Sequence, residues 1–354
     1  MTHDTPLAIG VVGCGAIVRS AHLPVLLGIG DARITAIADS DAAALDAVRA
    51  RVPHARAFPS ADALLAEGEV DAVIVAAPSA LHADLAVAVL ERRRHLYLEK
   101  PIATTAADAQ RVLDAWRRAG CIGVVGYNYR RNPLVHSAAS MLRRGDVGRA
   151  IAFRTVFSTC FHDSATPRSW RHSRASGGGV LLDLAPHHID LIRFLSGVEV
   201  VRVFAQIRSH HSEDDTALLL LELSDGSTAD LFVSLSSAES DRVEIYGERG
   251  RIVVDRYREH SVVADPLRAH RSAFDYAKRL GARARGLAYA VAKRRAPAHE
   301  PSFARTMHDF VAACRANRPM SPDLADGFAS LAVVLAAEES SRSGRAVDVA
   351  SFLA

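Results

Sequence analysis

Asp183 and His187 lie four residues apart in the stretch 177–190, which reads GGGVLLDLAPHHID. On a helix this spacing places both side chains on one face. A carboxylate beside an imidazole can hold the ring in one orientation and tune its basicity near neutral pH. Lys100, in the sequence Glu99-Lys100-Pro101, could complete such a site as an electrostatic partner. Together with a nucleotide-binding turn near the start of the chain, these residue types predict a site for hydride transfer.

A glycine turn predicts a dinucleotide site. The apolar run 7–12 leads directly into GCGAIV and then into a helix. Glycines at such a turn let backbone N–H groups and the helix N-terminus approach a pyrophosphate. Val18 occupies the third glycine position of the usual fingerprint, so we expect the strand and the helix to pack slightly further apart. The residues expected to hold the dinucleotide here are Gly13, Gly15, Ala16 and Ile17.

Asp39 ends the next predicted strand. This is roughly the position at which a carboxylate bonds the adenosine ribose 2′-hydroxyl. Asp41 is close by in the sequence, and two carboxylates would repel a 2′-phosphate. The pair therefore favours NAD as the cofactor over NADP.

The order of predicted elements up to residue 127 indicates a doubly wound parallel sheet. Continuous apolar runs alternate with segments of helical periodicity, which is typical of strands covered on both faces. The expected strands are 7–12, 33–38, 72–76, 95–98 and 122–125, and the expected helices are 21–27, 42–51, 84–92 and 106–119.

After Tyr127 the strands follow one another without helices between them. This pattern predicts an α+β domain with a mostly antiparallel sheet of about five or six strands. The expected strands are 150–157, 200–207, 217–223, 228–234, 241–246 and 251–255, and the expected helices are 133–143, about 182–195, 303–317 and 324–341.

Length and composition limit the class of protein. A chain of 354 residues exceeds the usual size of a single core, so we expect two domains, 1–127 and 128–354. A net charge of +3 is too small to argue for nucleic acid, and no apolar run approaches the ~20 residues of a membrane span. The N-terminus lacks a signal-peptide pattern and the four cysteines are scattered, so we expect a cytoplasmic protein with reduced thiols.

These motifs resemble the glucose–fructose oxidoreductase and inositol dehydrogenase family (Gfo/Idh/MocA) over nearly the whole chain. The resemblance implies a Rossmann domain followed by an α+β domain whose open sheet often mediates oligomerisation, and hence a homodimer or homotetramer. It also implies a small-molecule substrate, either a sugar, a sugar derivative (possibly nucleotide-linked) or a cyclitol. The motifs that carry it are GCG with HLP at 22–24, APS at 77–79 with His82, EKP at 99–101, GYNYR at 126–130, and GGG with Asp183 and His187.

The resemblance also assigns roles to individual residues. His187 would be the general acid/base, Asp183 would hold substrate hydroxyls or orient His187, and Lys100 would contact the reacting hydroxyl and the nicotinamide. Residues lining the cofactor cleft would be Pro78, Glu99 and His82, the last of which could otherwise lie on a helix surface. The substrate would meet Tyr127, Asn128, Arg130, Arg171 and His188, although Arg130 could equally be a structural ion-pair partner.

The helix that carries Asp183 and His187 departs from the family's pattern at Ala185 and Pro186, where glycine and a non-proline residue are frequent. Pro186 removes a backbone donor, so the alignment of the two side chains would rest on a kinked turn. His188 adjoins His187 and is the alternative imidazole. The spacing from Asp183 favours His187, with His188 as a packing residue.

Two other segments have simpler interpretations. The sequence HHSEDD at 210–215 holds metal-ligand residue types, but neighbours on a turn rarely converge, so we expect a solvated loop and no metal. The segment 268–295 carries nine basic residues and one acid beside an apolar side. It predicts a solvated helix or an oligomer arm. The alternative is a surface that recruits a phosphate-bearing substrate or lies on an anionic membrane.

Three functions agree with these observations. The first is NAD-dependent oxidation of a secondary alcohol, in which His187 removes the hydroxyl proton and Lys100 stabilises the alkoxide. The second uses transient oxidation to permit elimination, such as glycoside cleavage or dehydration, without net accumulation of NADH. The third is a non-catalytic nucleotide sensor or scaffold. The presence of Lys100, Asp183 and His187 counts against it.

Overall fold

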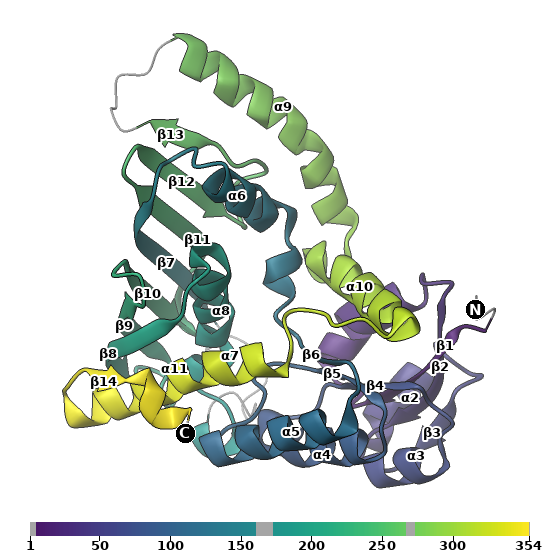
Figure 1. Cartoon of the computed structure of the whole chain (residues 1–354). Helices are drawn as coiled ribbons and strands as arrows, with labels where there is room; N and C mark the ends of the chain where they lie inside the picture. The colour runs from purple at the N-terminus through teal and green to yellow at the C-terminus, as the bar shows by residue number, and fades with distance from the viewer. Residues whose placement is uncertain (1–4, 161–172, 267–272, 354) are drawn as a thin grey trace. The chain divides into compact units, whose positions relative to one another are not determined.

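The computed structural model describes residues 5–160, 173–266 and 273–353 (Figure 1). The chain groups into two compact units. The first comprises Met1–Asn128 and Ala296–Leu331, and the second comprises Tyr129–Arg295 and Ala332–Ala354.

A six-stranded parallel sheet forms the centre of the first unit. Its order, β3-β2-β1-β4-β5-β6, is that of a doubly wound dinucleotide fold, in which ligands bind where the order reverses, between β1 and β4. The predicted fold class is thereby confirmed. The strands are β1 (Leu7–Val12), β2 (Ala32–Ala38), β3 (Arg56–Phe58), β4 (Ala72–Val75), β5 (His95–Leu98) and β6 (Gly123–Val125).

One strand and one helix of this unit have no counterpart among the expected elements. Strand β3 is only three residues long and its first two residues are exposed, so it lacks the apolar run by which strands are recognised. Helix α3 (Ala61–Glu67) follows it, and its N-cap Ser60 accepts a hydrogen bond from Ala63 N. The other helices between strands are α1 (Leu23–Leu26), α2 (Ala42–Arg49), α4 (His82–Glu91) and α5 (Ala106–Ala119).

Helix α10 (Ser302–Ala316) belongs to the first unit, although the expected division at residue 127 placed it in the second domain. It contacts α1 and β1, and it buries Met307 and Phe310 in the same apolar cluster as Ile9 and Tyr97. Figure 1 shows α4 and α5 side by side below the sheet and α10 above it. The returning chain therefore completes the cover of a sheet that needs apolar cover on both faces.

An eight-stranded sheet dominates the second unit. It contains the six strands expected from the sequence and two short edge strands that were not expected, β13 and β14. All of its strand pairs are antiparallel except β7 with β10, which run parallel. The order is β13-β12-β11-β7-β10-β9-β8-β14, with β7 (Ala150–Cys160), β8 (Val200–Arg208), β9 (Thr216–Leu223), β10 (Thr228–Ser234), β11 (Ser236–Gly247), β12 (Gly250–Asp255), β13 (Ala264–Pro266) and β14 (Val347–Asp348).

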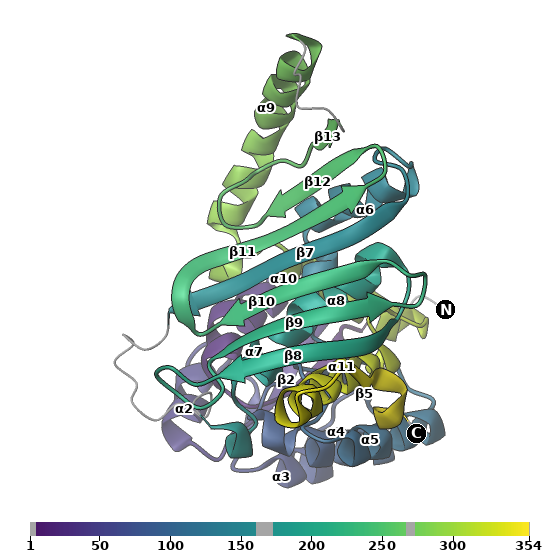
Figure 2. The ribbon, with the colours of Figure 1, turned by 90° about the vertical axis from the view of Figure 1, so that its left-hand side faces the viewer.

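The two faces of this sheet differ. Helix α8 (Ala185–Ser196) packs against β7 and β10, and α6 (Pro133–Arg143) packs against β12. Figure 2 shows the opposite face of the strands without helices over it. Along β9, buried residues alternate with Leu218 and Leu220, which are about half exposed on the uncovered face. The open face of the second sheet therefore combines exposed apolar side chains with ion pairs such as Arg154–Asp230 and Arg202–Glu222.

The basic segment forms helix α9 (Ala273–Arg295) over its described part. It meets its own unit through small residues, because Ala282 is buried and Gly286 lies against His260. Leu280 and Leu287 are about two-thirds exposed on the helix. The last long helix, α11 (Leu324–Ser343), runs from the first unit into the second.

Candidate functional site

The glycine turn after β1 leaves room for a dinucleotide. Gly13 has φ +92°, and a Cβ there would lie 2.3 Å from the Ala76 carbonyl oxygen, so only glycine fits this close approach to the end of β4. A Cβ built at Gly15 would meet nothing within 4 Å. The helical turns begin at once after it and include the π-helical turn Val18–His22. The open space at Gly15 fits a pyrophosphate at a helix N-terminus.

Asp39 connects the end of β2 to this turn. Its Oδ2 accepts a hydrogen bond from Cys14 N at 2.6 Å, and its Oδ1 accepts one from Asp41 N at 2.8 Å. Each carboxylate oxygen can accept a further hydrogen bond, and the side chain is partly exposed. These residues therefore fit NAD, and the placement of Gly13, Gly15, Ala16 and Ile17 at the pyrophosphate and of Asp39 at the ribose stays a prediction.

His82 ties together the loops that follow β4 and β5. The ring is buried, with Nδ1 2.6 Å from the Pro101 carbonyl oxygen and Nε2 2.9 Å from that of Ala77. Burial lowers the pKa of His82, although the hydrogen bonds to the two carbonyl oxygens act in the opposite direction. The exposed Pro78 and the partly buried Lys100 lie beside these carbonyls in the sequence. His82 is thus a buried link and not a residue of the helix surface.

Glu99 precedes Lys100 and forms a buried pair with His22. The Nε2 of His22 lies 2.7 Å from Oε1 of Glu99. Burial alone would raise the pKa of Glu99, but the hydrogen bond and charge of His22, with Lys100 nearby, outweigh burial and lower it. The sequence alone did not mark His22 as the partner of Glu99, since the two residues are 77 positions apart.

In the second unit, Asp183 and His187 do not share one helix. Asp183 ends α7 (Val180–Asp183) and His187 is the third residue of α8, so the continuous helix expected over about 182–195 is wrong. Pro186 has no N–H to donate to the preceding turn. The next residue, His187, donates its backbone N–H to the Leu184 carbonyl oxygen, three residues back, and not to the carbonyl four residues back as in a regular α-helix. The kink expected from Pro186 is therefore present, between the two candidate residues.

The two adjacent histidines have different surroundings. His187 is partly exposed, and its ring stacks on Tyr129 with centroids 4.4 Å apart and planes at 22°. His188 is fully buried, stacks on Phe157, and places Nε2 3.3 Å from Asp241 Oδ1. Of the pair, His187 alone offers an edge to a bound molecule. This geometry favours His187 as the acid/base and His188 as a packing residue.

Arg256 and Asp241 lie behind these rings and were missed by sequence reasoning. The Nη1 of Arg256 is 2.9 Å from Asp241 Oδ2, and the Arg256 guanidinium lies 3.2 Å from the centroid of Tyr129. Burial would raise the pKa of Asp241, but the charge of Arg256 and the hydrogen bond of His188 lower it. Neither residue belongs to a motif, so no local signal could have identified them.

The other expected substrate residues are mostly buried. Asn128 donates to Ser302 Oγ at 2.8 Å, and Tyr127 is 1% exposed. Arg130 makes two hydrogen bonds to Asp190, at 2.8 and 2.6 Å, which supports its role as a structural ion-pair partner. Arg171 lies outside the described residues. Lys100 belongs to the first unit, and Asp183 and His187 belong to the second.

The loop at 210–215 is held by Asp215. This buried carboxylate accepts hydrogen bonds from the backbone N–H groups of His210, His211 and Ser212. Burial would raise the pKa of Asp215, but these N–H groups and the Ser236 hydroxyl lower it to about 2. Over residues 5–160, 173–266 and 273–353 no group of three His, Cys, Asp or Glu side chains is placed to hold a metal, and no helix is long and apolar enough to cross a membrane.

Comparison with known proteins agrees with both halves of the chain. Residues 7–127 match the model of an oxidoreductase family with an NAD-binding Rossmann fold, and residues 135–253 match the GFO/IDH/MocA C-terminal domain. The chain is 32% identical to inositol 2-dehydrogenase 2 of Saccharopolyspora erythraea, over 69% of this chain and 72% of that protein. It is 29% identical to myo-inositol 2-dehydrogenase of Thermotoga maritima, over 73% of this chain and 78% of that one.

A solved structure shares the fold over nearly the whole chain. The WlbA dehydrogenase from Bordetella pertussis, in complex with NADH and UDP-GlcNAcA, superposes with a TM-score of 0.86 over 98% of each chain, at 24% identity. The arrangement of a Rossmann unit and a large open sheet is therefore common to both proteins.

Proposed function

The chain belongs to the Gfo/Idh/MocA family of NAD-dependent oxidoreductases acting on CH–OH groups, and we propose that its substrate is a sugar, a sugar derivative or a cyclitol, oxidised or reduced at a secondary hydroxyl. The observation that carries the proposal is the partly exposed His187, next to the fully buried His188. Inositol dehydrogenases among the relatives support the substrate class.

In this reaction His187 removes the proton of the substrate hydroxyl, and returns it in the reverse direction. Lys100 stabilises the negative charge that develops on the same oxygen. Asp183, buried at the end of α7, orients the imidazole or holds a neighbouring hydroxyl. Bound NAD would supply the hydride acceptor for the carbon that bears the hydroxyl.

The test is NADH formation with purified protein and a panel of inositols, free sugars, anhydrosugars and nucleotide-linked sugars, followed at the NADH absorbance band. We expect one class to be oxidised, and Lys100→Met to lower kcat while calorimetry shows unchanged NAD affinity. Product formed without net NADH, from protein that retains its nucleotide, would instead establish an elimination. NAD binding without turnover of any class would favour a sensor.

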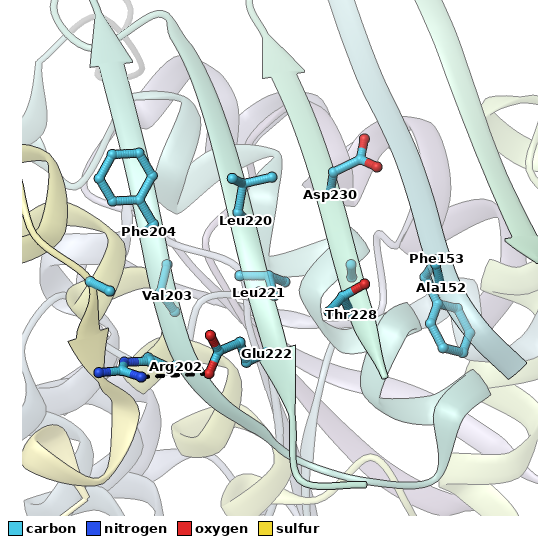
Figure 3. Close-up of a pocket in the computed structure, with 12 residues that line it drawn as sticks. Ala152, Phe153, Arg202, Val203, Phe204, Leu220, Leu221, Glu222, Thr228 and Asp230 are labelled. Atoms are coloured by element: carbon cyan, nitrogen blue, oxygen red, sulfur yellow. Dashed lines mark ion pairs between the residues drawn. The ribbon is translucent and has the colours of Figure 1, made fainter. Parts of the chain in front are cut away.

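We also propose that the open sheet face pairs with a second copy of the chain, giving a homodimer or a homotetramer. A hollow of about 410 Å³ lies on this sheet. Figure 3 shows Phe204 and Leu220 among its lining residues, with the Arg202–Glu222 ion pair at one end. Exposed apolar side chains on an ordered sheet favour association. Sedimentation should show an oligomer for the native chain and a smaller species for Leu218→Glu/Leu220→Glu. A native monomer would contradict the proposal.

A cytoplasmic location is part of the proposal. Cys14 and Cys314 are buried thiols without a disulfide partner, and burial raises the pKa of Cys14 to about 12. Thiols persist in reducing compartments. Fractionation of cells that make the protein tests this, and recovery outside the cytoplasmic fraction would contradict it.

A further inference from the structure

Three side chains, His187, Tyr129 and Arg256, form a column that begins at the proposed acid/base residue. The ring of Tyr129 stacks on His187 with centroids 4.4 Å apart. The guanidinium carbon of Arg256 lies 3.2 Å from the centroid of the same Tyr129 ring. Phe157 meets both rings edge-on, at 6.0 Å from each centroid. The His187 ring is thus in contact with Tyr129, and the Tyr129 ring is in contact with Arg256.

Arg256 is held more firmly than the rings it supports. Its side chain is 5% exposed and pairs with Asp241, which is 1% exposed. Arg256 N donates to Asp241 O at 2.9 Å, and the Lys293 ammonium of α9 donates to the Arg256 carbonyl oxygen. Tyr129, by contrast, is partly exposed. A fixed cation against a partly exposed ring restrains that ring, because a guanidinium is attracted to an aromatic face.

We propose that Arg256 is a positioning residue for His187, acting through the ring of Tyr129. The inference rests on the proposed function of His187 in proton transfer. A proton moves efficiently only when the ring nitrogen lies within hydrogen-bond reach of the hydroxyl and points at it. Loss of the restraint on Tyr129 lets the imidazole plane tilt, and small misplacements of a catalytic group slow a reaction by large factors.

The charges around His187 allow position and electrostatics to be separated. Arg256 lies across the Tyr129 ring, and Asp241 lies behind it, bonded to His188. Among the described residues, Asp183 ends α7 just before His187, and the charge of Lys293 also acts on Asp241. Removing Arg256 alone leaves the Asp241 carboxylate without its cation. Removing both charges restores neutrality but not the restraint on Tyr129.

The experiment compares Arg256→Met, Arg256→Lys and the double variant Arg256→Met/Asp241→Asn in the full chain. Arg193→Met is the matched control, because Arg193 is another buried arginine of this unit and pairs with Glu199 and Asp190, which are not members of the column. The first readout is NMR of histidine-labelled protein, in which the His187 signal is assigned by its loss in His187→Gln. The second is kcat and KM across pH with the substrate found in the panel.

We expect the ring-current shift that Tyr129 imposes on His187 to shrink in all three column variants and to stay native in Arg193→Met. We expect kcat to fall about ten-fold or more in each column variant, with KM within about two-fold. The acid limb of the kcat profile should move up by about one pH unit in Arg256→Met and return towards the native position in the double variant. A loss of kcat and of ring-current shift that persists in the double variant, after the acid limb has returned, separates the restraint on Tyr129 from the charge of Arg256.

An unchanged His187 signal in folded Arg256→Met would overturn the proposal, whatever the substrate. If Arg256→Met fails to fold, Arg256→Lys and the charge-neutral double variant decide the question by the same signal. A His187 signal that moves in the column variants, in protein that oxidises no member of the panel, would uphold the positioning and refute the proposed function. The two failures are therefore distinguishable.

Discussion

Gly13 and Gly15 are two residues apart in one turn, and we predict opposite consequences for the same substitution. A Cβ at Gly13 would lie 2.3 Å from the Ala76 carbonyl oxygen, on a backbone with φ +92°. The left-handed conformation costs roughly 1–2 kcal/mol for an alanine, and relief of the overlap costs about 1–3 kcal/mol more. Gly13→Ala should therefore lower the free energy of unfolding by about 2–5 kcal/mol.

Gly15→Ala should leave the fold intact and weaken NAD binding. A Cβ at Gly15 meets nothing within 4 Å and its φ is not positive, so the free energy of unfolding should change by less than about 1 kcal/mol. The methyl group would occupy the space in which we place the pyrophosphate. Loss of one hydrogen bond to a charged group is worth about 1.5–3 kcal/mol, which raises the Kd for NAD about ten-fold to a hundred-fold.

Thermal unfolding and titration calorimetry of both variants test this pair of expectations. Stability should fall only in Gly13→Ala, and affinity should fall in Gly15→Ala at native stability. NAD affinity equal to the native value in Gly15→Ala would refute the placement of the pyrophosphate at this turn. A Gly13→Ala protein as stable as the native one would refute the argument from the contact with Ala76.

Four further outcomes are expected. Calorimetry should show that the native protein binds NAD more tightly than NADP, and tighter binding of NADP would contradict this. The difference in affinity between the two nucleotides should be smaller in Asp39→Ala, because this variant loses the carboxylate that repels a 2′-phosphate. It also loses a hydrogen bond to the glycine turn. Lys100→Ala and His187→Ala should each lower turnover by orders of magnitude at nearly unchanged NAD affinity, and a loss of turnover confined to His188→Ala would show that the wrong imidazole was chosen. The pKa of Asp215 is lowered to about 2, so its carboxylate stabilises the fold above the ordinary carboxyl pKa, and Asp215→Asn should lower the free energy of unfolding by about 2 kcal/mol at pH 7. Urea unfolding should show this loss shrinking as the pH falls from 5 towards 2. An equal loss at every pH would contradict the expectation. In α9, the positions to be replaced with glutamine are Arg283, Arg285, Arg294 and Arg295. If α9 is an oligomer arm, this variant should keep the native KM at low salt and show altered sedimentation. A raised KM that recovers as the salt concentration rises would instead indicate an anionic substrate.

Local pattern predicted the elements that have a strong local signal. The runs at 7–12 and 95–98 are continuous and apolar, and they became β1 and β5 with those bounds. Strands β3 and β14 are three and two residues long, and they exist because a neighbouring strand offers unpaired backbone groups. Such strands carry no periodicity of their own, so no window of sequence could identify them.

The sequence by itself determined the glycine turn, the carboxylate at Asp39 and the kink at Pro186, since each depends on residues within one turn or one strand of its neighbours. Only the tertiary structure decided that α10 covers the first sheet, that His82 is a buried link, and that Arg256 lies against Tyr129. Those contacts join residues far apart in the chain. Strand order and the packing of helices on the sheets bring them together, and neither is encoded in the spacing of residues along the chain.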